Sequence, residues 1–263
     1  LGSTPGCIIV KRTDTTGDWQ VYHNGLTSAA YSIQLDLTNA QASATTVWNS
    51  TAPTSTVFSV GTSTDVNANT GTYVAYLFAH NAGGFGLTGA DNVISCGSFT
   101  KDGSYNATVN LGYEPQWILV KCSDSSSGVG ANWLMADNMR GANYTNAPYL
   151  EANASIAEQT NGGAWFVPTA TGFQINGLSG GTGSSTHIYI AIRRGPMQVP
   201  TSGTSVFSPV IWSGNTTTQT QTRSISGFGK PTDLFIGSER ATTFNHNYTY
   251  DRLRGQDSSG RLL

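Results

Sequence analysis

The apolar residues of this 263-residue chain fall into short runs, some alternating with polar residues and some continuous. Runs of this length, set between clusters of Gly, Asn, Asp and Ser, are typical of β-strands and predict an all-β protein. The predicted strands are Cys7–Arg12, Trp19–His23, Tyr31–Leu37, Thr56–Val60, Tyr73–Ala79, Val93–Phe99, Ala107–Leu111, Trp117–Cys122, Trp133–Ala136, Ala164–Val167, Phe173–Ile175, Thr186–Arg193, Val206–Trp212, Arg223–Gly227, Leu234–Ser238 and Tyr248–Leu253.

Three stretches carry an apolar run without alternation: Tyr73–Leu77, Trp117–Val120 and Tyr189–Arg193. A continuous run indicates a central strand that is buried on both faces of its sheet. One further stretch, Tyr149–Glu158, has the Ala and Glu content of a helix of two or three turns. We therefore expect a β-protein with at most one short helix.

The order of these elements repeats along the chain. Leu1–Asp14 matches Leu111–Asp124 at a constant offset of 110 residues, and Gly227–Ile236 is a third copy, 116 residues further on. This period is far too long for a solenoid and suits a β-sandwich domain. We predict tandem antiparallel, jelly-roll-like β-sandwich domains, packed end to end and related by an internal repeat of about 110 residues.

The repeat divides the chain into a first unit at residues 1–92, a second at 93–204 and the start of a third at 205–263. The first unit starts at the position that Leu111 occupies in the second. It therefore lacks counterparts of the strands Val93–Phe99 and Ala107–Leu111, unless an upstream segment supplies them. We expect the sequence to be a window from a longer multidomain protein.

Composition excludes several classes of function. Charged residues make up 11% of the chain, the net charge is −2, and there are 35 Thr, 31 Gly, 28 Ser and 19 Asn. Thr and aromatic residues favour strands, whereas Gly, Asn and Ser favour turns. Because no positive excess exists, we expect no binding to nucleic acid. No stretch approaches the 18 apolar residues of a membrane span, so we expect no membrane insertion.

Residues that could carry catalysis are few. The histidines form no known motif and do not recur at matching places in the two units, which predicts surface or strand-end roles for His23, His80, His187 and His246. The cysteines lie too far apart for a paired metal site, which predicts small, buried hydrophobic residues at Cys7, Cys96 and Cys122. We expect no enzymatic activity, no cofactor and no metal.

One segment has oxygen-bearing side chains at alternate positions. Asp65, Asn67 and Asn69 could offer hard oxygen ligands to calcium. However, Gly71 falls one place late for an EF-hand loop, and the twelfth position is Tyr76 rather than Glu. A polar hairpin loop explains the pattern as well, so both interpretations stay open.

Tryptophans beside loops are candidates for stacking on sugars. Trp48, Trp165 and Trp212 lie next to loop segments rich in Asn and Thr, whose side chains can bond hydroxyl groups. The other three tryptophans fall inside strand patterns and are predicted to lie in the core. We therefore keep saccharide binding by the loops beside these tryptophans as one hypothesis.

Polar residues at strand ends also recur. Lys11 and Asp14 match Lys121 and Asp124, and the pair Arg140–Gly141 matches residues 254–255. These groups could form a binding rim. Alternatively, they could form ion pairs that fix the ends of strands, for instance Arg140 on a carboxylate.

The repeated motifs resemble those of a known family. The runs Thr4–Lys11, Asp18–His23, Glu114–Lys121, Asp137–Gly141 and Ile188–Arg193 are similar, in content and in order, to an uncharacterised repeated β-domain of marine bacteriophage virion proteins, often associated with tails or fibres. The third copy departs by having Gly237 where the others have Lys, and the first copy has Asn24–Gly25 in place of Arg-Gly. The resemblance covers essentially the whole chain and implies a structural or adhesion protein without assigned catalytic residues.

These observations lead to a functional expectation. We expect a structural and adhesion module of a bacteriophage virion, in a tail fibre or another surface appendage that takes part in host attachment. Such a module would be extracellular and would contact copies of itself, other virion proteins and, as a further candidate partner, a host surface glycan. The alternatives are a carbohydrate-binding module of a secreted or cell-surface protein and a polysaccharide depolymerase.

Overall fold

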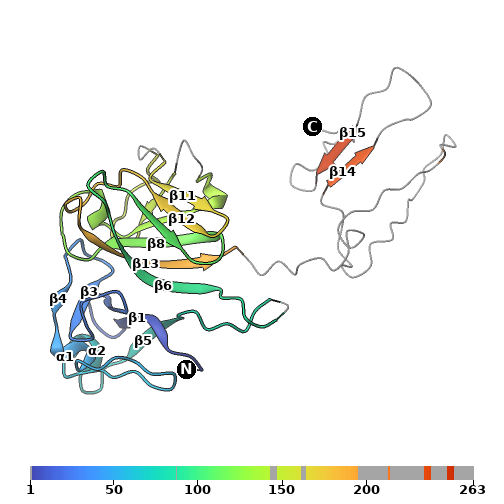
Figure 1. Cartoon of the computed structure of the whole chain (residues 1–263). Helices are drawn as coiled ribbons and strands as arrows, with labels where there is room; N and C mark the ends of the chain where they lie inside the picture. The colour runs from blue at the N-terminus through green and yellow to red at the C-terminus, as the bar shows by residue number, and fades with distance from the viewer. Residues whose placement is uncertain are drawn as a thin grey trace. The chain divides into compact units, whose positions relative to one another are not determined.

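The computed structural model describes residues 2–86, 88–142, 147–160, 164–194, 213, 234–237 and 248–251 (Figure 1). In this part of the chain the protein is nearly all β, with three antiparallel sheets of three or more strands and two four-residue α-helices. The all-β prediction is confirmed. The chain divides into a compact unit at Leu1–Gln198 and a second unit at Val199–Leu263.

The first five-stranded sheet, called sheet 1 here, comes from the N-terminal part of the chain. Its strand order is β4-β3-β2-β1-β5, and all of its pairs are antiparallel. Its strands are β1 (Pro5–Arg12), β2 (Gln20–His23), β3 (Tyr31–Gln34), β4 (Ala42–Ser43) and β5 (Tyr73–Ala79). The short helices α1 (Thr45–Trp48) and α2 (Thr64–Asn67) lie in the connection between β4 and β5.

The second five-stranded sheet, sheet 2, has the order β10-β9-β8-β13-β6. Its strands are β6 (Ile94–Thr100), β8 (Pro115–Cys122), β9 (Leu134–Asp137), β10 (Leu150–Glu151) and β13 (Thr186–Arg193). A three-stranded sheet, sheet 3, has the order β11-β12-β7. It comprises β7 (Ala107–Asn110), β11 (Phe166–Thr169) and β12 (Gly172–Ile175). Two 3₁₀ turns, η1 (Val129–Ala131) and η2 (Asn138–Arg140), flank β9.

Sheet 2 lies between the other two sheets, as Figure 1 shows for β8 and β13. Successive side chains of a strand point to opposite faces, and in β8 Ile118 and Val120 pack toward sheet 3. Leu119, between them, packs with Ile9 and Ile33 of sheet 1. The two sheets contributed by the predicted first and second units therefore share one core instead of forming separate sandwiches packed end to end.

The outer face of sheet 1 carries a third apolar cluster. Ile8 and Val10 of β1 pack there against Val47 and Trp48 of α1 and Val66 of α2. The two helices thus cover one face of sheet 1, and each is only one turn long. The compact unit Leu1–Gln198 is layered as helices, sheet 1, sheet 2 and sheet 3.

Strand order in the two large sheets agrees at the positions that the sequence repeat aligns. β3-β2-β1-β5 in sheet 1 occupies the same order as β10-β9-β8-β13 in sheet 2. The internal repeat remains a prediction. It requires corresponding strands to occupy corresponding positions in the two sheets, and these four strands do so. The expected boundary between residues 92 and 93 lies inside the compact unit Leu1–Gln198.

The predicted strands at Tyr73–Ala79 and Thr186–Arg193 have the observed bounds, and most of the other described ones agree to within one to three residues. The run Thr56–Val60 is not a strand. Tyr149–Glu158 is not a helix but contains β10 followed by turns, and the expectation of at most one short helix is wrong because two one-turn helices form at Thr45–Trp48 and Thr64–Asn67. In Tyr149–Glu158, pairing of Leu150 with Met135 of β9 prevails over helix propensity. In the expected third unit, β14 (Leu234–Gly237) and β15 (Tyr248–Asp251) form an antiparallel pair. The predicted strands Val206–Trp212 and Arg223–Gly227 lie outside the described residues.

Burial confirms two of the three predicted central strands. β8 and β13 are buried on both faces, whereas β5 lies at the edge of sheet 1 and exposes Tyr76 and Leu77. The continuous apolar run of β5 therefore did not indicate a central position.

The shared core makes a prediction about cooperativity. Ile33 in sheet 1 is fully buried against residues of sheet 2, so Ile33→Ala should lower the free energy of unfolding by about 2–5 kcal/mol. Unfolding in urea can be monitored through amide hydrogen exchange in β2 and β9. The amides of both strands should lose protection in a single transition. Val57→Ala, at an exposed position, should change stability by no more than about 0.5 kcal/mol. Separate transitions for β2 and β9 would contradict a shared core.

Candidate functional site

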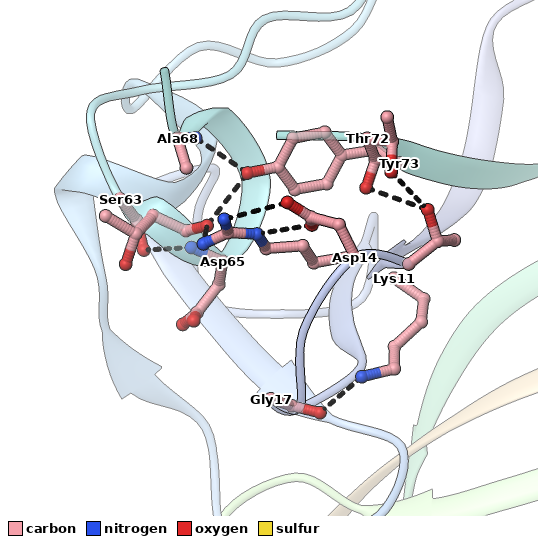
Figure 2. Close-up of polar contacts among 11 residues, drawn as sticks. Lys11, Asp14, Gly17, Ser63, Asp65, Ala68, Thr72 and Tyr73 are labelled. Carbon is pink, nitrogen blue, oxygen red and sulfur yellow. Dashed lines mark hydrogen bonds and ion pairs between the residues drawn. The ribbon is translucent and has the colours of Figure 1, made fainter. Parts of the chain in front are cut away.

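Charged and polar side chains gather where β1 ends, β5 begins and α2 lies beside them (Figure 2). This group, called the β1-end cluster, consists of Lys11, Arg12, Asp14, Asp65 and Tyr73. It contains the first copy of the recurring Lys and Asp that the sequence singled out as a binding rim or a fixed strand end.

Arg12 and Asp14 form the strongest contact of the β1-end cluster. The guanidinium donates through Nε to Oδ1 at 2.7 Å and through Nη2 to Oδ2 at 3.0 Å, a two-pronged pairing. This hydrogen bonding lowers the pKa of Asp14 and raises that of Arg12. Both groups lie at the surface, so the pair orders the chain after β1 rather than contributing much stability.

Tyr73 connects the start of β5 to α2. Its hydroxyl donates to the Thr64 carbonyl at 2.8 Å and accepts from the Ala68 N–H at 2.6 Å (Figure 2). Ser63 caps the same helical turn by accepting from the Asp65 N–H. The local sequence thus folds as a capped turn instead of the polar hairpin loop that the Asp65–Asn69 pattern allowed.

Two of the three side chains proposed for calcium form hydrogen bonds within the chain. Asp65 accepts from the Gln20 side chain at 3.1 Å, and Asn67 donates to the Gly61 carbonyl at 2.8 Å. Within the described residues, no group of three or more His, Cys, Asp or Glu side chains is arranged to hold a metal ion. Asp18 lies near further carboxylates, and its pKa is raised by partial burial and then by the charges of Asp36 and Asp65.

The recurring lysines make the same contact in both sheets. Lys11 donates to the Gly17 carbonyl at 2.6 Å, two residues before Trp19. Lys121 donates to the Ala131 carbonyl, which likewise lies two residues before a tryptophan. Each lysine therefore holds the loop that leads into the next strand of its sheet. This arrangement favours the structural interpretation over the binding rim.

The two recurring lysines differ in how deeply they are buried. Lys121 is completely buried and also donates to the Thr38 carbonyl at 2.9 Å, so it joins sheet 2 to the loop that follows β3. Burial lowers its pKa from 10.5 to about 8. Asp124 does not pair with it but accepts from the Thr186 N–H at 2.7 Å.

The second recurring motif also has a structural role. Arg140 binds Asp137 at 2.8 Å and Glu158 at 2.7 Å, as the ion-pair alternative expected. Gly141 follows at φ 93°, a left-handed conformation that ends the turn η2 and favours glycine. Residues 254–255 lie outside the described residues.

Two of the tryptophans predicted to face a glycan are buried, so that prediction is wrong for them. Trp48 is 1% exposed, packs edge-on against Tyr22 and donates to the Ser32 hydroxyl. Trp165 is 3% exposed and donates to the Ala147 carbonyl. Each ring closes a loop over a sheet, which leaves no open face for a sugar. Trp212 lies outside the described residues.

The three tryptophans that strand patterns placed in the core do pack there. Trp133 is buried and donates from its indole to the Gln34 carbonyl, across the boundary between the two sheets. Trp19 and Trp117 are partly buried against the same cluster. The prediction for this set is confirmed.

The three described histidines lie near strand ends, but two of them are not at the surface, and His246 lies outside the described residues. His23 is buried, with Nε2 3.0 Å from the Tyr189 carbonyl of sheet 2 and Nδ1 accepting from the Gly25 N–H. His187 is buried against the Phe99 ring, and its Nε2 has no hydrogen-bond partner. Burial lowers both pKa values to about 4. Cys7, Cys96 and Cys122 are buried, as predicted.

One buried polar residue was missed from the sequence. Lys101 is 3% exposed and donates to the carbonyls of Leu178 and Gly180, which lead into β13. Its pKa is lowered by burial. Lys101 directly precedes Asp102 and Gly103, residue types that are typical of exposed turns, and nothing in the sequence points to the distant carbonyls.

Comparison with known proteins identifies a family and no individual relative. The model of a family described as a domain of unknown function (DUF7483) matches residues 1–196. No curated protein and no solved structure matches the chain. Among the described residues, no helix is long and apolar enough to cross a membrane.

The buried lysine yields a prediction with a definite sign. The unfolded chain keeps Lys121 protonated up to about pH 10.5, whereas the folded chain releases the proton near pH 8. Stability should therefore rise with pH between these values, by as much as about 3 kcal/mol. Urea unfolding from pH 7.5 to 10.5 should show this rise in the wild type relative to Lys121→Met. Parallel pH profiles for the two proteins would contradict it.

The buried histidines predict loss of stability in acid. Both are neutral in the folded protein to about pH 4, but in the unfolded chain they bind protons below about pH 6.5. Their contribution is complete above pH 6.5 and falls as the pH drops toward 4. His187→Phe keeps a ring on Phe99 and should remove up to about 3 kcal/mol of this acid sensitivity. An unchanged difference between urea midpoints at pH 7 and 4.5 would argue against this role.

Proposed function

The chain belongs to the DUF7483 family over residues 1–196, and we propose that it is a structural and adhesion module of a bacteriophage virion. The module forms part of a tail fibre or another surface appendage that takes part in host attachment. It acts outside the cell, as a homo-oligomer in contact with other virion proteins, and its role is not enzymatic.

The observation that carries this proposal is the use that the chain makes of its few charged groups. Lys11 and Lys121 hold equivalent loop carbonyls, and Arg140 joins β9 to the segment after β10 through Asp137 and Glu158. The charged side chains that were candidates for a binding rim thus hold loops and strands of the layered β-structure in place. A braced, charge-poor body suits a component that must keep its shape in an exposed appendage.

The resemblance of the repeated motifs to virion proteins supports the same role. It rests on runs such as Glu114–Lys121, which contains most of β8, and Ile188–Arg193, which forms most of β13. These runs build the doubly buried centre of sheet 2. The shared motifs are therefore scaffold residues, as expected for a family of structural modules.

The carbohydrate-binding alternative loses support from the fold. Two of its three candidate rings, Trp48 and Trp165, are core residues. Aromatic side chains that are exposed, Tyr76, Phe85 and Tyr105, belong to separate segments of the chain. We therefore retain host-surface glycan as a candidate partner of the assembled appendage rather than as a ligand of this module alone.

Immunogold electron microscopy tests the proposed role. An antibody raised against the purified chain should label particles of the phage that encodes it, on an appendage, and should reduce their adsorption to host cells. Unlabelled particles, with the protein recovered from the soluble fraction of the lysate, would contradict a virion role. If the isolated chain then bound a glycan array, the carbohydrate-binding alternative would take its place.

A further inference from the structure

The exposed edge of sheet 1 has features of an interaction surface. β5 forms this edge over seven residues, pairs with β1 on one side, and contains no charged residue. Tyr76 is 49% and Leu77 37% exposed. Free edges of soluble sheets are commonly protected by charges, Pro or bulges, because an open edge can pair with another strand.

The register of β1 and β5 shows which backbone groups are open. Thr13 N–H donates to the Thr72 carbonyl at 2.8 Å, one pair beyond the end of the ladder. Bonded and non-bonded pairs alternate along antiparallel strands, so every second residue of β5 turns its N–H and C=O away from β1. These residues are Tyr73, Ala75 and Leu77. No hydrogen bond to another residue in the described part of the chain satisfies their outward groups.

In sheet 2, the edge that corresponds to the open edge of β5 is covered by another strand. β13 holds in sheet 2 the position that β5 holds in sheet 1, and β6 pairs with it along its whole length. The Lys101 N–H donates to the Ser185 carbonyl and the Arg193 N–H to the Val93 carbonyl, which fixes the bonded pairs. They are His187↔Phe99, Tyr189↔Gly97 and Ala191↔Ser95.

The two edges can be superimposed through their central strands. Ile9 of β1 faces Tyr76, and Leu119, 110 residues after Ile9, faces Ile190. Tyr76 of β5 therefore corresponds to Ile190 of β13. With this register, the three open residues of β5 correspond to the three residues of β13 that bond β6.

We propose that the free edge of β5 accepts an antiparallel strand of β6 type, supplied by another repeat unit of the same family. The counterpart of Gly97 lies opposite Ala75, with those of Phe99 and Ser95 opposite Tyr73 and Leu77. The incoming strand is uncharged and combines small residues with apolar ones, as β6 does. This inference goes beyond the proposed function and does not depend on it.

Side chains on the outer face of sheet 1 suit this occupant. Tyr73 packs with the cluster under α1 and α2, and Ala75 and Leu77 lie on the same face. In sheet 2, Phe99 of β6 joins the cluster on the corresponding face of β13. A strand beside β5 would therefore extend the apolar layer under the helices by one row and cover Leu77.

Peptide binding tests the proposal on the intact chain. The probe is a fluorescent peptide with the sequence of residues 93–101, carrying Cys96→Ser to prevent disulfide exchange, and a scrambled peptide is the control. Saturable binding should appear in fluorescence anisotropy. Amide exchange should slow at Tyr73, Ala75 and Leu77, whereas the intervening residues of β5 are already protected by β1.

Edge variants locate the binding. Ala75→Pro removes an outward N–H without touching the bonds to β1, and Leu77→Lys places a charge on the edge; each should weaken peptide binding by about tenfold or more. Ser98→Pro makes the matched change on the exposed edge of β6 and should leave binding unchanged. Circular dichroism reports whether each variant is folded, and Leu77→Lys carries the test if Ala75→Pro unfolds.

Three outcomes would overturn the proposal. The first is the same affinity in the wild type, Ala75→Pro and Leu77→Lys. The second is loss of binding in Ser98→Pro alone, which would place the peptide at β6. The third is dimerisation of the chain without peptide, abolished by Ala75→Pro, which would make β5 of a second copy the occupant.

Discussion

Burial of sheet 2 on both faces is the constraint on which the rest of the molecule depends. Ile118 and Val120 of β8 pack toward sheet 3, and Leu119 between them packs toward sheet 1. Neither face of the central strands can be solvated, so each flanking layer must come from elsewhere in the chain. Sheet 1 covers one face and sheet 3 the other, which explains why Leu1–Gln198 form a single compact unit. Polar residues near strand ends are buried in this packing as well: Lys121 and His187 in sheet 2, and His23 at the end of β2 in sheet 1.

Much of the fold could be predicted from local pattern. The strands of sheet 2 were recognisable because Trp117–Val120 and Ile188–Ile192 are apolar at every position, and a strand with two buried faces requires this. The same pattern misled at β5, since an edge strand that awaits a partner also needs apolar residues on both faces. The segment Tyr149–Glu158 misled because its Ala and Glu residues favour a helix, whereas pairing with β9 depends on distant residues. The helix propensity of a segment carries no information about its pairing with a distant strand.

The candidate site was predictable in position more than in contacts. The repeat located Lys11 and Lys121 correctly at strand ends, but the carbonyls they bind lie in loops whose course depends on the next strand. Trp48 and Trp165 show the opposite error. Both stand beside loops rich in small polar residues, yet each loop is folded back by its own tryptophan, whose indole N–H finds an acceptor inside. A large aromatic residue in a polar loop can be the anchor that makes the loop compact.

The low charge of the chain has a structural consequence at the sheet edges. Proteins usually protect an exposed edge strand with Lys, Pro or a bulge, and β5 has none of these along Tyr76–Ala79 or the residues before them, apart from the register shift near Pro5 on its partner strand. On an otherwise charge-poor surface, electrostatic repulsion is also too weak to keep other strands away. An edge of this kind is tolerable when a defined strand occupies it, and the pairing of β13 with β6 shows the form that such an occupant takes in the same molecule. The low charge of the chain and the open edge of β5 therefore both favour the pairing proposed for this edge.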